Sequence, residues 1–312
     1  MNGHDHHHDH VHAGVTDNTD SKRLSIALAL ILAFMVAEVA VGVLVHSLAL
    51  LSDAAHMLTD AGALVLSLIT VRLIARPAKG NLTFGLKRAE ILSAQANGYT
   101  LLFLAGLIVF EGIRRLISPP SPGGLAILIV ALAGIAVNLL ATWQLSKANR
   151  ESMNIRGSFQ HLVTDLLAFV FTAIAGAVIL ITGFARADGI ASLVIAAIML
   201  WAAFGLLRDS GRVLLEAAPE GMDVDAIGKS LADHPRVRNV HDLHVWQIGS
   251  GFPALSAHVL VAPGDDCHGV RGELERALLT EFGIEHTTLQ VDHARDTLFV
   301  KRLAQTGSGP DT

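Results

Sequence analysis

The chain has 312 residues, of which 52% are apolar and 16% charged, and its mean hydropathy is +0.50. A soluble domain carries about 25% charged residues, so this composition excludes an ordinary water-soluble protein and indicates a lipid bilayer as its surroundings. The net charge of −5 argues against a nucleic acid partner, and the single cysteine, Cys267, excludes an intrachain disulfide.

The first 20 residues are polar and rich in histidine and aspartate. We predict a disordered tail over residues 1–20, which either captures cytosolic metal loosely or serves only as a solubilising segment. The apolar run from Leu24 to about Val45 is too long for a signal peptide and has no cleavage site. It is therefore predicted to be a retained transmembrane helix.

Six apolar stretches each approach the roughly 20 residues that a membrane-spanning helix needs. Proline and glycine punctuate several of the breaks between them, for example at Pro77, Gly80 and Pro119. We therefore predict an all-α, six-helix transmembrane domain over residues 21–210. Its helices are expected at Leu24–Val45, Leu48–Ile74, Ile91–Glu111, Leu125–Leu145, His161–Gly183 and Ile190–Leu207.

Lysine and arginine in the short flanks predict the orientation, because cytoplasmic loops carry an excess of these residues. If the N-terminus is cytoplasmic, the inside flanks hold Lys22, Arg23, Arg72, Arg76, Lys79, Lys87, Arg88, Lys147, Arg150, Arg156, Arg208 and Arg212, and the outside flanks hold Arg114, Arg115 and Arg186. This bias predicts that both termini are cytoplasmic.

The composition changes after about Arg212. Helical spacing over residues 223–232, strand candidates over 237–248 and 255–261, a helix over 270–282 and a last strand over 286–292 predict a small cytoplasmic α+β domain. We place this domain at residues 211–298, expect its sheet to be antiparallel, and predict a second disordered tail at 299–312.

Two predicted membrane helices carry the same motif, His-x-x-x-Asp, as His56 with Asp60 and His161 with Asp165. Residues four apart share one helix face, so each helix offers a nitrogen and an oxygen ligand to the same neighbour. An Asp at the membrane centre costs about 2.5–3.5 kcal/mol and usually marks an ion pathway. Two opposed pairs form an N2O2 set that suits tetrahedral Zn2+, and their carboxylates neutralise its charge. The alternative is hydrogen bonding between helices.

Three other polar residues lie inside predicted helices. Asp53 shares nearly one face with Asp60 and could be a fifth ligand, a proton carrier or the acceptor that orients His56. We favour the orienting role or a place in the outer vestibule. For Asn138 and Glu38 we expect interhelical hydrogen bonds.

Four segments closely resemble cation diffusion facilitator transporters of the zinc branch: Ser47–Asp60, Phe84–Leu92, Glu111–Arg115 and His241–Trp246. The resemblance extends from about residue 24 to residue 293. It implies a homodimer in the bacterial inner membrane that exports cytoplasmic Zn2+, with cadmium and cobalt as further candidates, in exchange for protons. It also implies a ferredoxin-like, metallochaperone-like cytoplasmic domain.

By the same resemblance, His241, His258 and Asp292 match positions that bind cytoplasmic zinc in this family. The alternative is that His241 only covers a sheet face together with His244 and Trp246. Three further residues could serve as ligands, and spacing does not choose among them: Cys267, His268 and His293.

These features predict a secondary active transporter rather than an enzyme, with Zn2+ as substrate and as a structural ligand of the tail, and with no organic cofactor. An intramembrane zinc hydrolase would need an open coordination position and a His-Glu-x-x-His helix, and the sequence has no such motif. A metal sensor that signals through its tail is the second alternative.

Overall fold

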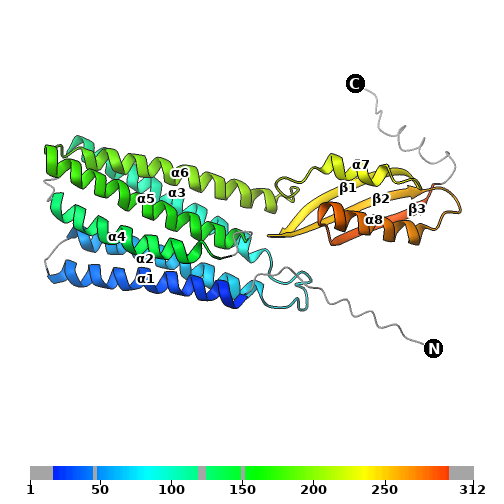
Figure 1. Cartoon of the computed structure of the whole chain (residues 1–312), viewed down its shortest axis with the longest axis horizontal. Coiled ribbons are helices and arrows are strands. Elements are labelled where there is room, and N and C mark those ends of the chain that lie inside the picture. The colour runs from blue at the N-terminus through cyan, green and yellow to red at the C-terminus, as the bar shows by residue number, and fades with distance from the viewer. Residues whose placement is uncertain (1–16, 45–47, 119–123, 149–151, 295–312) are drawn as a thin grey trace, which may run out of the picture. The chain divides into compact units, whose positions relative to one another are not determined.

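The structure, a computed structural model, describes residues 17–44, 48–118, 124–148 and 152–294, without the side chains of residues 17, 18, 42, 48–56, 124, 126 and 127. The chain divides into two compact units, Met1–Gly211 and Arg212–Thr312, which are described separately below (Figure 1). The tails predicted over residues 1–20 and 299–312 lie outside the described residues, except for the start of the first helix.

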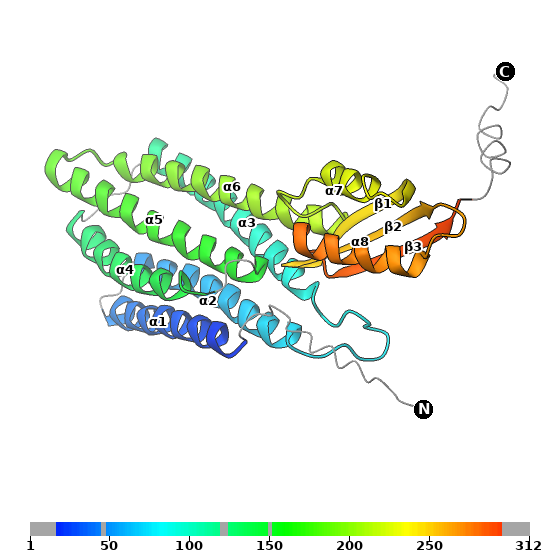
Figure 2. The same cartoon turned by 45° about the vertical axis from the view of Figure 1, so that its right-hand side comes forward.

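Six long helices that run alongside one another build the first unit, which confirms the predicted all-α architecture (Figures 1 and 2). The largest differences from the predicted bounds are at three helix ends: α1 begins before Leu24, α5 begins before His161, and α6 continues beyond Leu207. The helices are α1 (Asp17–Leu44), α2 (Leu48–Ile74), α3 (Ala89–Ile117), α4 (Gly124–Leu145), α5 (Met153–Thr182) and α6 (Ala187–Leu214).

Five of these helices are long and apolar enough to cross a membrane: α1, α2, α4, α5 and α6. Helix α3 has 29 residues but is not among the five, and its first half carries the polar residues Ser93, Gln95 and Asn97. Two of these, Ser93 and Asn97, are buried inside the bundle. The polar part of α3 therefore faces other helices rather than lipid.

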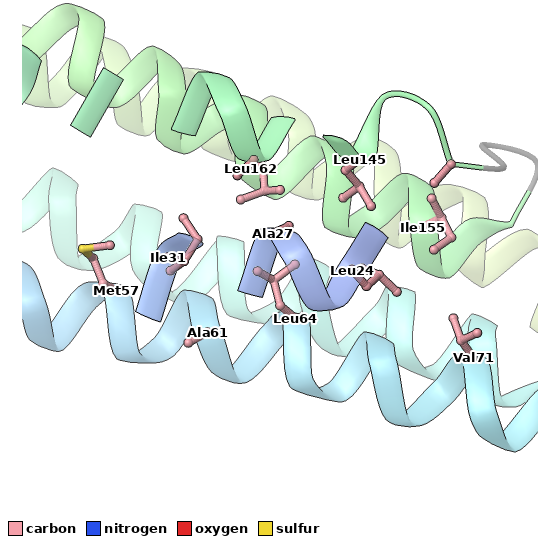
Figure 3. Close-up of a cluster of buried hydrophobic side chains, with 12 residues drawn as sticks. Leu24, Ala27, Ile31, Met57, Ala61, Leu64, Val71, Leu145, Ile155 and Leu162 are labelled. Atoms are coloured by element: carbon pink, nitrogen blue, oxygen red, sulfur yellow. The ribbon is translucent and has the colours of Figure 1, made fainter. Parts of the chain in front are cut away.

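Two apolar clusters hold the helices together. The larger one joins α1, α2, α4 and α5, with Leu24, Leu64, Leu145 and Leu162 almost fully buried (Figure 3). The second joins Leu101 and Leu104 of α3 to Ile195 and Met199 of α6. In protein interiors, which are close-packed, a change of even one methylene at such buried positions is felt.

Helices α4 and α5 approach each other closely where α4 has a glycine. An ideal Cβ atom at Gly134 would overlap the Phe169 ring, so only a residue without a side chain fits there unless the ring moves. The Phe169 ring also makes an edge contact with Phe34 of α1, at 6.3 Å between ring centroids. Three helices therefore meet at one point of the bundle.

The second unit is an α+β domain with α7 (Val224–Ala232), β1 (Val237–Gly249), β2 (Phe252–Val261), α8 (Cys267–Phe282) and β3 (His286–His293). The strand order is β1-β2-β3. The α+β class is confirmed, but the expectation of an antiparallel sheet is wrong in part, because β3 pairs parallel with β2. The 16-residue helix α8 supplies the crossover that a parallel pair requires.

We predict that Gly134→Ala destabilises the bundle, because its methyl group would overlap the Phe169 ring. Overpacking of this kind costs about 1–3 kcal/mol and should lower the melting temperature of the purified protein in detergent. Gly106→Ala in α3 is the matched control, since no atom lies within 4 Å of its added Cβ. Equal melting temperatures for the two variants would contradict the close α4–α5 contact.

Candidate metal centre

Helices α2 and α5 bring Asp60, His161 and Asp165 together. The His161 Nε2 atom lies 2.9 Å from Asp60 Oδ1 and 3.7 Å from Asp165 Oδ2. One potential ligand atom of each residue lies within 4.8 Å of the others, and among the described residues this is the only such cluster of three or more His, Cys, Asp or Glu. The predicted i, i+4 arrangement on α5 therefore faces α2 across the bundle.

The cluster is almost closed to solvent. The His161 side chain is 1% exposed, and those of Asp60 and Asp165 are 15% and 17% exposed. Two carboxylates this close and this deeply buried repel each other and have lost most of their hydration, which is unfavourable unless a cation lies between them. The Nε2 atom of His161 faces both carboxylates, so it can share with them either a proton or a metal ion.

The structure brings together three of the four predicted ligands. Helix α2 includes position 56, but the side chain of His56 is not described, nor is that of Asp53. Position 56 lies one helical turn before Asp60, as the motif requires. The roles of His56 as the fourth ligand and of Asp53 as its orienting partner stay predictions.

A buried hydrogen-bond network lies near this cluster and joins α2, α3 and α5. The Ser67 and Ser158 Oγ atoms are 2.5 Å apart, the Asn154 Nδ2 atom donates to the Ser67 carbonyl at 2.9 Å, and Ser93 Oγ donates to Asn154 Oδ1 at 2.7 Å. All four residues are at most 3% exposed. Seven residues, or about 10 Å of helix, separate Ser67 from Asp60 and Asn154 from His161.

This network was not predicted from the sequence. The fifth helix was expected to begin at His161, because apolarity rises there, whereas α5 begins two turns earlier at Met153. A usable signal was present: Asn154, Ser158 and His161 recur at intervals of four and three residues, which places them on one helix face. That spacing extends the polar stripe of the metal motif backward along α5.

In the second unit, His241 and His258 are cross-strand neighbours with ring centroids 5.3 Å apart. Asp292 does not join them, because the position beside His258 on β3 is Gln290. The Gln290 Nε2 atom donates to Asp292 Oδ2 at 2.8 Å. The structure therefore brings together two of the three predicted tail ligands.

Asp242 is a nearby residue that sequence reasoning missed. It lies in a bulge of β1 with φ of 56°, a left-handed conformation that Asp tolerates better than most residues. His244 Nε2 lies 2.9 Å from its Oδ1 atom, and His258 Nε2 lies 3.7 Å from its Oδ2 atom. The hydrogen bond from His244 holds the pKa of the Asp242 carboxyl below its usual value, and the charges of His258 and His241 add to this effect.

A buried His and Asp cluster between membrane-length helices is the arrangement found in ion carriers, where ionisable residues face the bundle interior. The comparisons with known proteins agree with this class. A model named cation efflux transmembrane domain matches residues 24–215, and one named cation efflux protein, cytoplasmic domain, matches residues 219–294. The chain therefore belongs to the cation efflux family.

Curated relatives match over most of their length. The zinc transporter ZitB of Pectobacterium atrosepticum is 38% identical, over 90% of this chain and 88% of the relative. The cadmium, cobalt and zinc/H(+)-K(+) antiporter of Bacillus subtilis is 35% identical, over 88% of this chain and 90% of the relative. The cation efflux system protein CzcD of Alcaligenes sp. is 38% identical, over 88% of this chain and 87% of the relative.

We predict that Asn154→Leu destabilises the protein more than Ser93→Ala does. The leucine leaves the Ser93 hydroxyl and the Ser67 carbonyl without this partner, and a buried orphaned polar group costs about 1–3 kcal/mol. Melting temperatures in detergent should fall in the order wild type, Ser93→Ala, Asn154→Leu. Ser25→Ala, which removes an exposed hydroxyl that donates to the Ser21 carbonyl, is the control and should leave the melting temperature unchanged.

Proposed function

We propose that this protein exports Zn2+ from the cytoplasm in exchange for protons, by alternating access around the Asp60–His161–Asp165 cluster. The observation that carries the proposal is that one potential ligand atom from each of these three side chains lies within 4.8 Å of the others, between helices of membrane length. His56 completes the set as a fourth, nitrogen ligand. A tetrahedral N2O2 site with two carboxylates is neutral when it holds Zn2+, which favours passage through a low-dielectric surrounding.

Protons drive the cycle because they compete with the metal for the same atoms. Histidine titrates near neutral pH, and a metal binds only its deprotonated nitrogen. In the inward-facing state Zn2+ displaces the protons held at the cluster, and in the outward-facing state protons displace Zn2+. Because the two carboxylates repel each other when bare, the cluster favours the states that hold a cation, and the exchange of one cation for the other links transport to the proton gradient.

The chain is embedded in the bacterial inner membrane as a homodimer, with both termini in the cytoplasm. The lysine and arginine bias of the flanks supports this orientation. The names of the relatives, which include cadmium and cobalt beside zinc, support a cargo range that extends beyond Zn2+. Function as a carrier needs neither catalytic residues nor an organic cofactor.

In the cytoplasmic domain, His241 and His258 bind a second Zn2+. Their adjacent rings provide two nitrogen ligands, and Asp292 lies on the same sheet face, two residues beyond the partner of His258. Because both rings are solvent-accessible, this metal regulates or stabilises the domain rather than being carried.

We expect Asp165→Asn and Asp60→Ala to remove Zn2+ flux in proteoliposomes with an imposed pH gradient. Each exchange deletes a negative ligand and leaves the loaded site with an uncompensated positive charge, so flux should fall by at least about tenfold. Asp188→Asn is the matched control, because Asp188 is a buried aspartate on α6 that pairs with Arg115 instead. Full flux in Asp165→Asn would remove the proposed site. A wild type that moves no metal would favour a sensor.

A further prediction concerns the cytoplasmic domain. The segment of residues 219–305 should melt at a higher temperature with Zn2+, since a ligand at 100 times its Kd stabilises the folded state by about 2.7 kcal/mol. His258→Ala should abolish this gain and slow transport by the full chain without stopping it. If His268→Ala abolishes the gain and His258→Ala does not, the ligands are those at the start of α8. No gain in the wild-type segment would leave His241 and His258 as a polar sheet face.

A further inference from the structure

Asn138, on α4, has a buried carboxamide whose nitrogen donates a hydrogen bond and whose oxygen accepts none from the described residues. The residue is 2% exposed, and its Nδ2 atom donates to the Gly134 carbonyl of the same helix at 3.1 Å. Only the nitrogen of the amide can donate to a carbonyl, so this bond fixes which atom is the oxygen. The Oδ1 atom is buried and has no hydrogen-bond partner among the described residues. The sequence predicted a hydrogen bond from Asn138 to another helix, whereas the bond that forms stays within α4.

Two contacts define how α4 and α5 align at this point. Thr142 Oγ1 lies 3.5 Å from the Leu162 carbonyl oxygen, and Gly134 lies against the Phe169 ring. Asn138 is four residues from each of the two α4 positions, on the face that they share. On α5, Asp165 is three residues after Leu162 and four before Phe169, also on the shared face. Asn138 therefore lies level with Asp165, across the α4–α5 interface.

Both residues at this level keep an oxygen without a hydrogen bond. Asp165 Oδ2 is buried and has no hydrogen-bond partner among the described residues, as is true of Asn138 Oδ1. Leaving one buried polar atom without a hydrogen bond costs about 1–3 kcal/mol, so such atoms in native proteins call for an explanation, for example contact with a bound ion. Asp165 Oδ2 belongs to the candidate cation site, and Asn138 Oδ1 is buried at the same level of the neighbouring helix. A cation bound at that level would give both oxygens a partner, whereas two acceptor oxygens cannot bond to each other.

We propose that Asn138 provides a further oxygen donor to the transported ion, from α4, and thereby helps to set which metals are carried. The inference rests on the proposed function of the Asp60–His161–Asp165 cluster. A carboxamide oxygen is a neutral donor, so it can raise the coordination number of a bound ion without changing the charge of the site. Zn2+ is satisfied by four ligands, whereas ions that prefer five or six gain from an added oxygen. Asn138 therefore broadens the cargo toward Cd2+ while leaving the charge of the loaded site unchanged.

The test is competition between Cd2+ and Zn2+ for uptake into proteoliposomes by the full chain. Asn138→Leu, which keeps the volume and removes the oxygen, should lower the Cd2+:Zn2+ uptake ratio by about tenfold, the lower end of what a lost partner of a metal site costs. Asn138→Asp keeps an oxygen at the same place and should hold the ratio at or above that of the wild type. Gln144→Leu, the same amide-to-leucine exchange on the same helix, is the control and should leave the ratio unchanged.

An unchanged ratio in an active Asn138→Leu variant would overturn the proposal and make Asn138 a packing residue. A uniform loss of uptake for both metals in that variant, with the ratio kept, would do the same. If Asn138→Leu does not insert, the Asn138→Asp variant decides, because a ratio well below that of the wild type contradicts an oxygen donor at this position. Failure of the wild type to move either metal would instead reject the transport function itself, so the two failures are distinguishable.

Discussion

The repulsion between two carboxylates held out of water is the constraint on which the rest of the first unit depends. Asp60 and Asp165 lie on different helices, and each is costly in a membrane by about 2.5–3.5 kcal/mol. Only a shared cation offsets this cost, and His161 lies where it can carry a proton to both. The helices must also pack tightly enough to exclude water, which would otherwise hydrate the two carboxylates in place of the cation. The close contact between Gly134 of α4 and Phe169 of α5 provides such packing.

The buried stripes around the cluster differ in polarity on its two sides. Toward the beginnings of α3 and α5 they carry Ser93, Asn97, Asn154 and Ser158, whereas farther along α3 they carry Leu101, Leu104 and Ala105. Polar groups can exchange their protein partners for water at little net cost, but apolar groups cannot. By the predicted orientation the polar side is the cytoplasmic one. In the predicted orientation, hydration of a path to the proposed ion site therefore costs least from the cytoplasmic side.

The sequence alone predicted the six helices, the α+β domain and the shared helix face of His161 and Asp165, because hydrophobic length and i, i+4 spacing are local properties. What it could not provide depends on contacts between distant segments. The start of α5 was placed too late because the prediction used hydrophobic length, although the spacing of Asn154, Ser158 and His161 already indicated one helix face; only their hydrogen-bond partners on α2 and α3 had to come from the structure. The parallel pairing of β3 follows from the crossover through α8. The level of Asn138 relative to Asp165 follows from two interhelical contacts that no local pattern encodes.

The two candidate metal sites, one in the helix bundle and one in the cytoplasmic domain, differ in the free-energy cost of being without a metal ion. His241 and His258 lie on a solvent-accessible sheet face, where water hydrates the rings when no metal is bound. Such a site can be empty at low metal concentration and fill as the concentration rises. The cluster of Asp60, His161 and Asp165 differs, because without a proton or metal ion its two carboxylates face each other in a poorly hydrated space. A buried site that cannot stay empty must exchange one cation for another, and this requirement by itself makes an antiporter of a metal carrier.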